Sequence, residues 1–184
     1  MYIKQHCHIH KKGKMDSYII KNTKQFMSLL LANSAFDEFF LESARITTFN
    51  TFTIDGVVKK EFYSADEYEE LYGSNANTSG HIYGSNANTS GHIYASYAQV
   101  RPYIYEIIKG KRAPISFQII LHAPEAMYEN NDYEAGVRYI LNIKYEDGRV
   151  SCVSAISRSD FTLDKTSDQL WDKKAFMFIE SLNC

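Results

Sequence analysis

The sequence predicts an α+β domain in which an antiparallel sheet of about five strands is covered mainly on one face by helices. Residues 115–157 alternate apolar and polar side chains in three runs, which is the period of two of half-buried strands. Asp-Gly pairs at 55–56 and 147–148 are typical of tight hairpin turns. Apolar residues at helical spacing flank the strand segments, so helices are expected to cover the sheet.

The run from 115 to 157 predicts a three-stranded meander. Its first two strands place on one face Ile115, Phe117, Ile119 and Leu121, then Val137, Tyr139, Leu141, Ile143 and Tyr145. A type I′ turn at Asp147-Gly148 sets Glu146 opposite Arg149, and this register places Ile143 opposite Cys152. Cys152 then lies on the apolar face, where its thiol should be protonated and inert.

A second hairpin is expected over residues 44–63. Threonine and aromatic residues favour strands there, and Asp55-Gly56 repeats the turn signal. Together the two segments give the expected five strands, although the sequence leaves open whether the hairpins join edge to edge.

Five helical stretches are expected around these strands. Apolar spacing and capping signals place them at 23–31, at 34–40 after Ser34, at 65–72 behind a Ser64–Glu67 capping box, at 96–109, and from Thr166 or Ser167 onward. Pro102 either begins the fourth stretch or kinks it, because proline has no amide hydrogen to donate. The last helix should pack on the sheet through Trp171, Ala175, Phe178, Ile179 and Leu182.

Two segments differ in composition from the rest of the chain. The 11 letters GSNANTSGHIY at 73–83 recur unchanged at 84–94, which indicates a recent tandem duplication. Their low apolar content predicts a solvated, flexible loop, since little burial is available to offset the entropy of ordering. Residues 1–14 are expected to be a disordered leader or a wrongly assigned start, so that 15–184 form a single domain.

Both segments contain side chains that can bind metal ions. His6, Cys7, His8 and His10 carry soft ligands for zinc or copper, but ligands this close together in a flexible tail form no closed tetrahedral site. His81 and His92 could in principle share a metal across the repeat, although an insertion without one is the simpler interpretation. The prediction is therefore no metal and no cofactor.

Composition places the protein in the ordinary globular range. With 184 residues, 45% of them hydrophobic and 23% charged, one substantial core is expected. A formal net charge of -2 gives no overall attraction to nucleic acids or anionic membranes. Three cysteines without metal-type spacing fit a reducing compartment, and the apolar run at 26–32 is too short for a membrane span. A cytoplasmic location without membrane contact is expected.

The polar face of the predicted sheet is the candidate binding surface. Together with the basic turn before its first strand, it supplies Lys109, Lys111, Arg112, Gln118, His122, Arg138, Asn142 and Lys144 as ligand-binding candidates. Cations and amides on one platform could hold an anion or a nucleic-acid backbone. A face left to water is polar by default, however, so an ordinary solvated surface is the competing interpretation.

No familiar catalytic motif occurs, since the sequence contains no nucleophile elbow, GxGxxG, GxxxxGK[ST], HExxH or CxxC. A non-catalytic binding or regulatory module is therefore the first hypothesis, with an anionic ligand, a nucleic acid or a protein as its partner. The alternative is a small hydrolase in which His122 acts as a general base beside Glu125, Asp132 or Glu134.

The segments TTFNTFTIDG at 47–56 and IKGKRAPISFQIIL at 108–121, with the phenylalanine-rich stretch before them, carry a resemblance. They resemble an uncharacterised family of small bacterial proteins known only as a domain of unknown function. The similarity covers Met15 to the C-terminus apart from the duplicated segment. It implies a bacterial cytosolic domain and supplies no catalytic residue, ligand or partner.

Overall fold

A computed structural model describes residues 17–72, 80–83, 92–127, 137–158 and 162–182. Its centre is a six-stranded antiparallel sheet in the order β1-β8-β7-β6-β2-β3. The strands are β1 (Ser17–Ile19), β2 (Phe40–Thr47), β3 (Thr51–Asp55), β6 (Ser116–His122), β7 (Arg138–Glu146) and β8 (Arg149–Ser157). A separate two-stranded sheet pairs β4 (Gly80–Tyr83) with β5 (His92–Ala95). The α+β class and the antiparallel sheet are confirmed.

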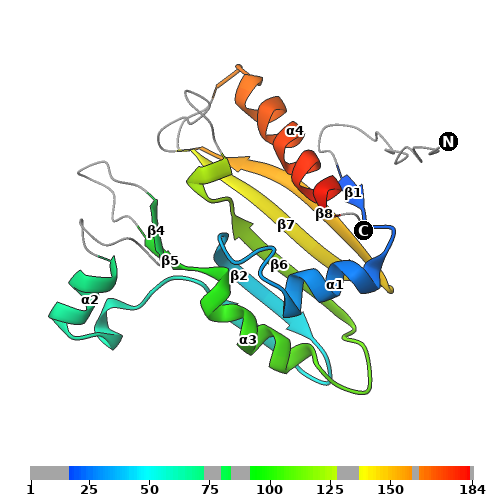
Figure 1. Cartoon of the computed structure of the whole chain (residues 1–184), viewed down its shortest axis with the longest axis horizontal. Coiled ribbons are helices and arrows are strands. Elements are labelled where there is room, and N and C mark those ends of the chain that lie inside the picture. The colour runs from blue at the N-terminus through cyan, green and yellow to red at the C-terminus, as the bar shows by residue number, and fades with distance from the viewer. Residues whose placement is uncertain (1–16, 73–79, 84–91, 128–136, 159–161, 183–184) are drawn as a thin grey trace.

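The helices lie mainly on one face of the large sheet. They are α1 (Thr23–Ala32), α2 (Ala65–Tyr72), α3 (Tyr97–Ile108) and α4 (Thr166–Ser181), and short 3-10 turns occur at Lys60–Phe62 and Glu125–Met127. Figure 1 shows α1, α3 and α4 in front of the sheet, while α2 lies to one side near β4 and β5. Every helix in the described parts of the chain is too short or too polar to cross a membrane.

The core lies between the sheet and these three helices. Alternate residues of β6, β7 and β8 are almost fully buried on the covered face, among them Ile119, Leu141 and Cys152. The helices contribute Phe26, Leu30 and Leu31 from α1, Tyr97, Ile104 and Ile108 from α3, and Trp171, Ala175 and Ile179 from α4. The Trp171 indole also donates a hydrogen bond to the carbonyl of Ile140, 3.0 Å away, which fixes α4 on β7.

The predicted central register is confirmed. Asp147 and Gly148 have positive φ angles of 51° and 75°, the backbone that a type I′ turn needs, and Ile143 pairs with Cys152. The two hairpins also join, because β2 pairs with β6. Two details differ from expectation: β1 adds a sixth strand, and Ile115 is 68% exposed because β6 begins one residue after it.

The turn expected at Asp55-Gly56 is wrong. The hairpin reverses earlier, between Thr47 and Thr51, so that Asp55 is the last residue of β3. Gly56 instead approaches another strand closely: a Cβ atom built on it would lie 1.7 Å from the carbonyl oxygen of Leu41. Glycine is required at this position by a tertiary contact and not by turn geometry.

The helical predictions hold in four of the five stretches. Residues 34–40 form turns and the start of β2 in place of a helix, although Phe36 and Phe39 are buried as core residues. The Ser64–Glu67 capping box is present, with the Ser64 amide 2.9 Å from the Glu67 carboxylate. Pro102 lies inside α3, which begins earlier at Tyr97 behind a capping box formed by Ser96 and Gln99.

The second repeat copy does not end as a solvated loop. Residues 92–95 form β5, whose Ile93 and Tyr94 are only 8% and 5% exposed. Backbone contacts fasten β5 to the large sheet, since Val57 bridges Tyr94 and the Ala95 amide donates to the Gly56 carbonyl at 2.9 Å. Residues 1–14, most of the first copy and the intervening part of the second copy lie outside the described residues.

Candidate functional sites

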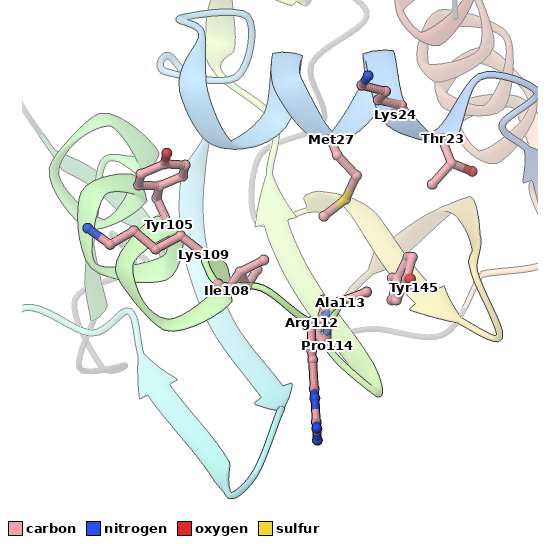
Figure 2. A pocket seen from close by; sticks show the side chains of 11 residues that line it. Thr23, Lys24, Met27, Tyr105, Ile108, Lys109, Arg112, Ala113, Pro114 and Tyr145 are labelled. Carbon is pink, nitrogen blue, oxygen red and sulfur yellow. The ribbon is translucent and has the colours of Figure 1, made fainter.

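A cleft of about 500 Å³ opens between the start of α1, the end of α3 and the turn that leads into β6. Its walls consist of Thr23, Lys24, Met27, Tyr105, Ile108, Lys109, Gly110, Arg112, Ala113, Pro114 and Tyr145. Figure 2 shows Met27 pointing from α1 into the cleft, with Ala113 and Tyr145 below it. The floor and walls of the cleft are therefore largely apolar.

The rim of the cleft is cationic. Lys24, Lys109 and Arg112 all belong to the lining, which contains no acidic residue. In Figure 2 the charged ends of Lys109 and Arg112 extend away from the apolar floor. Lys109 also forms an exposed ion pair with Glu106 at 2.6 Å, a contact that solvent screens strongly.

Backbone geometry adds to the positive potential of this cleft. α1 begins at Thr23 with Asn22 as its N-cap, and the Asn22 side chain accepts a hydrogen bond from the Gln25 amide at 3.1 Å. The positive end of the helix dipole thus lies at the wall formed by Thr23 and Lys24, and its first turn contains no acidic residue that would neutralise it.

Three of the eight candidate residues lie in the basic turn at this cleft. Lys109 and Arg112 line it, whereas Lys111 is exposed on the same turn and is not part of the lining. Lys111 therefore does not share the cleft with Lys109 and Arg112.

The other five candidates lie along the face of the sheet opposite the helices. There they form hydrogen bonds or ion pairs with neighbouring side chains. Gln118 donates to Asn142 at 3.1 Å, Lys144 pairs with Glu146 at 2.6 Å, and Arg138 donates to the Ser157 hydroxyl at 2.9 Å. Arg138 and Lys144 stand six residues apart on one strand, a separation of about 20 Å. These cations therefore do not converge with the basic turn on one site.

His122 belongs to a buried polar cluster at the end of β6. Its Nε2 atom lies 2.9 Å from Oε2 of Glu42, and its side chain has no exposed surface. The Tyr94 ring stacks on the imidazole with centroids 4.7 Å apart. A bulge in β2 between Leu41 and Ser43 brings Glu42 to this position, because the extra residue has no partner on β6.

Electrostatics in this cluster favour the ionised carboxylate. Hydrogen bonding to His122 lowers the pKa of Glu42 below 4.5, and the charges of His122 and Arg138 act in the same direction against desolvation. Burial raises the pKa of the Tyr94 phenol above 10.0, although Arg138 partly opposes that shift. The cluster thus holds a carboxylate and an imidazole in contact beneath a neutral phenol.

The carboxylates that the sequence suggested for His122 are not the ones found beside it. The Glu125 side chain, Asp132 and Glu134 lie outside what the structure describes, and Glu42 takes the place next to the imidazole. The positions of Glu42 and Tyr94 beside His122 leave no signal in the sequence, because the first depends on a bulge and the second lies in the repeat. Lys24 was also missed as a residue of the cleft. The signal that could have pointed to it is its place in the first turn of a predicted helix, where the helix dipole also favours negative charge.

Metal-binding side chains do not gather here. Among the residues that the structure describes, no group of three or more His, Cys, Asp and Glu side chains could hold a metal ion. The histidine-rich segment at 6–10 lies outside those residues.

Comparison with known proteins places the chain in a family without assigning an activity. Neither a curated protein nor a solved structure matches it. One family model matches residues 29–184. The match includes the last four residues of α1, the lining of the cleft after Met27, and the cluster of Glu42, Tyr94 and His122. The chain therefore belongs to the family described as "Family of unknown function (DUF5721)".

Proposed function

We propose that the protein is a non-catalytic binding module whose cleft between α1, α3 and the 109–114 turn holds a small anion with an apolar body. One observation carries the proposal: the lining combines an apolar floor with three cationic residues and no acidic one. Such a combination of an apolar pocket and a few polar groups is typical of small-molecule sites.

The size and walls of the cleft suit a compact ligand. A volume of about 500 Å³ falls within the range of small-molecule pockets. Met27, Ile108 and Tyr145 would contact the apolar body. A flexible cationic side chain at the rim, Arg112 or Lys24, would attract the acidic group. A carboxylate, sulfonate or phosphate shares the required chemistry, and the N-terminus of α1 adds a further favourable interaction with negative charge.

A small anion is favoured over a nucleic acid. The cations on the open face of the sheet lie on more than one strand, with Arg45 on β2 and Arg138 and Lys144 on β7, and Lys144 already pairs with Glu146 at 2.6 Å. A nucleic-acid backbone needs several phosphate contacts along a continuous positive surface. The net charge of -2 adds no overall attraction to a polyanion. A regulatory role would follow if ligand binding altered contacts of the protein with a partner.

The test is a titration followed by amide chemical shifts. Three probes are compared: 2-naphthoate, the neutral 2-naphthalenemethanol, and inorganic phosphate. We expect 2-naphthoate to shift the amides of Lys24, Gly110 and Tyr145, with weaker shifts from the neutral analogue and from phosphate alone. Equal shifts from the acid and the alcohol would show that the cations play no part.

Substitutions in the lining of the cleft test whether 2-naphthoate binds there. Ala113→Trp should fill the cleft and abolish binding of 2-naphthoate, and Arg112→Ala should weaken it several-fold. Lys111→Ala is the matched control, because Lys111 has the same charge on the same turn but does not line the cleft. The proposal fails if 2-naphthoate causes no shifts, or if Lys111→Ala weakens binding as much as Arg112→Ala does.

A small hydrolase is the second candidate, favoured by the 2.9 Å contact between His122 and Glu42. A carboxylate that holds an imidazole in place can prepare it as a general base. The Tyr94 ring covers the imidazole, however, so a substrate would first have to displace that ring. Hydrolysis of p-nitrophenyl acetate by the parent, compared with Tyr94→Ala and His122→Gln, tests this. Turnover that rises in Tyr94→Ala and disappears in His122→Gln would support it.

A further inference from the structure

β3 forms one edge of the large sheet. Among the described strands it pairs only with β2, so its other side presents backbone donors and acceptors without a strand neighbour. Figure 1 shows the cyan hairpin of β2 and β3 at this border of the sheet. Edge strands readily add a further strand unless something prevents it.

The usual protections are missing from β3. Proteins guard sheet edges with very short strands, proline, lysine, bulges or a covering segment. β3 reads TFTID and contains no proline or lysine, and the bulge lies in β2. Its single charge, Asp55 at the end of the strand, forms an ion pair with Lys59 at 2.7 Å within the same chain. By contrast, the opposite edge is β1, which is only three residues long.

We propose that β3 is a dimer interface at which two copies of the chain pair β3 with β3, antiparallel, about a two-fold axis through Thr53. The strand is its own complement in this register. Thr53 faces Thr53 of the second copy, Phe52 faces Ile54, and Thr51 faces Asp55, so no like charges are opposed. The pairing joins the two six-stranded sheets into one.

Side-chain orientation supports this register. Phe52 and Ile54 pair with Ile46 and Ala44 of β2, so they lie on the helix-covered side of the sheet, where Ile54 packs against the core. Their mutual pairing across the axis would extend that apolar layer into the second copy. Thr51 and Thr53 lie on the open side and are exposed, as a hydroxyl pair at such an axis requires.

An exposed aromatic residue stands beside the edge. Phe49 is 93% exposed in the turn before β3 and packs edge-on against Phe52 with centroids 5.9 Å apart. In the proposed pairing, the end of β3 next to Phe49 lies beside the residues that follow Asp55 in the second copy, which include the half-buried Val57. The dimer would thus cover apolar surface at both ends of the strand pair.

The expected association is weak and reversible. A five-residue strand pair with two flanking phenylalanines covers less than the roughly 1,200 Å² of a standard stable interface. The dimer should therefore form at concentrations in the micromolar range or above and dissociate on dilution.

The experiment is sedimentation velocity of the full chain over a concentration series from roughly 10 µM to 1 mM. Thr53→Lys and Thr53→Glu each place like charges opposite each other at the axis, so each variant alone should dimerise at least about tenfold more weakly than the parent. An equimolar mixture of the two should regain association, because lysine then faces glutamate. Thr53 is exposed and lies opposite Arg45 of β2, so within one chain Thr53→Lys should be slightly less stable and Thr53→Glu slightly more stable than the parent, by about 1 kcal/mol or less. Weaker dimerisation in both variants, in spite of these opposite effects on stability, assigns the loss to the axis.

Ser17→Lys on β1 is the matched control, since it places the same charge on an exposed residue of the opposite edge. It should leave dimerisation unchanged. The proposal is overturned if the parent remains monomeric throughout the series, if Thr53→Lys dimerises as well as the parent, or if Ser17→Lys and not Thr53→Lys abolishes dimerisation. Failure of the lysine and glutamate variants to associate in the mixture would exclude the register about Thr53.

Discussion

The ring of Tyr94 stacks on the imidazole of His122, with 4.7 Å between centroids and 30° between planes. Tyr94 comes from the second copy of the repeat, and His122 is the last residue of β6. This stacked pair thus connects the duplicated segment to the central sheet and covers one face of a fully buried histidine.

Tyr94→Ala tests the strength of this connection. The ring is 5% exposed, so its removal leaves a cavity over His122, and we expect the free energy of unfolding to fall by about 3 kcal/mol. Urea unfolding measures the change. Tyr103→Ala is the control, because Tyr103 is 67% exposed and its loss should change stability by about 0.5 kcal/mol or less. Similar losses in the two variants would contradict the role of the stacked pair.

Removal of one repeat copy should change little. Deletion of 84–94 and deletion of 73–83 give the same sequence, because the copies are identical. Either way a His-Ile-Tyr segment still precedes Ala95, so the strand that occupies β5 is retained and only its partner β4 is lost. We expect the melting temperature of the shortened chain to lie within a few degrees of the parent. A large drop would show that β4 is needed to hold β5 in place.

Stability should fall in acid through Glu42. Hydrogen bonding to His122 lowers the pKa of Glu42 in the folded state below 4.5, so the ionised carboxylate stabilises the fold above that value. This contribution is lost as the pH falls through the lowered folded-state pKa. In urea unfolding from about pH 7 to about pH 3, the stability difference between the parent and Glu42→Gln should shrink toward acid.

The pH series needs a control that removes His122, the hydrogen-bond partner of Glu42. In a His122→Gln background, Glu42→Gln should cost about the same at every pH, because the main cause of the lowered pKa is gone. If the stability difference between the parent and Glu42→Gln stays constant with pH, the contact between Glu42 and His122 does not stabilise the fold.

Gly56→Ala should be strongly destabilising. The added Cβ atom would lie 1.7 Å from the Leu41 carbonyl oxygen, and backbone would have to move to relieve the overlap. We expect a loss of at least about 2 kcal/mol in urea unfolding. Gly110→Ala is the matched control, because its nearest neighbour, the Arg112 carbonyl oxygen, is 4.0 Å away. If the two variants unfold at the same urea concentration, the claim that the Leu41 carbonyl excludes a side chain at Gly56 is wrong.

Local signals predicted the central sheet well. Asp147-Gly148 and the alternation around it fixed the pairing of Ile143 with Cys152, because turn chemistry and side-chain period are both encoded in neighbouring residues. The same dipeptide at Asp55-Gly56 gave a wrong prediction of a turn. Glycine is required there because the carbonyl of Leu41 leaves no room for a Cβ atom, and not because of the local backbone. A dipeptide cannot distinguish these two reasons for a glycine.

The candidate sites were predictable only in part. Lys109 and Arg112 stand out in the sequence because they follow a helix, and both line the cleft. The contact of Glu42 with His122 depends on a bulge, and the covering Tyr94 comes from a segment whose composition suggests a loop. Such tertiary neighbours leave no period or motif in the sequence, so the burial of His122 could not be foreseen.

The burial of Cys152 gives this protein a built-in chemical reporter. Its side chain has no exposed surface and lies on β8, the strand next to the edge strand β1, on the face of the sheet that the helices cover. A thiol reagent can reach it only when the covering helices or the neighbouring strands move away, so the labelling rate measures how often this part of the core opens. With Cys7 and Cys184 replaced by serine, that rate would report opening of the core around Cys152 in the parent fold and in every variant described above, without denaturant.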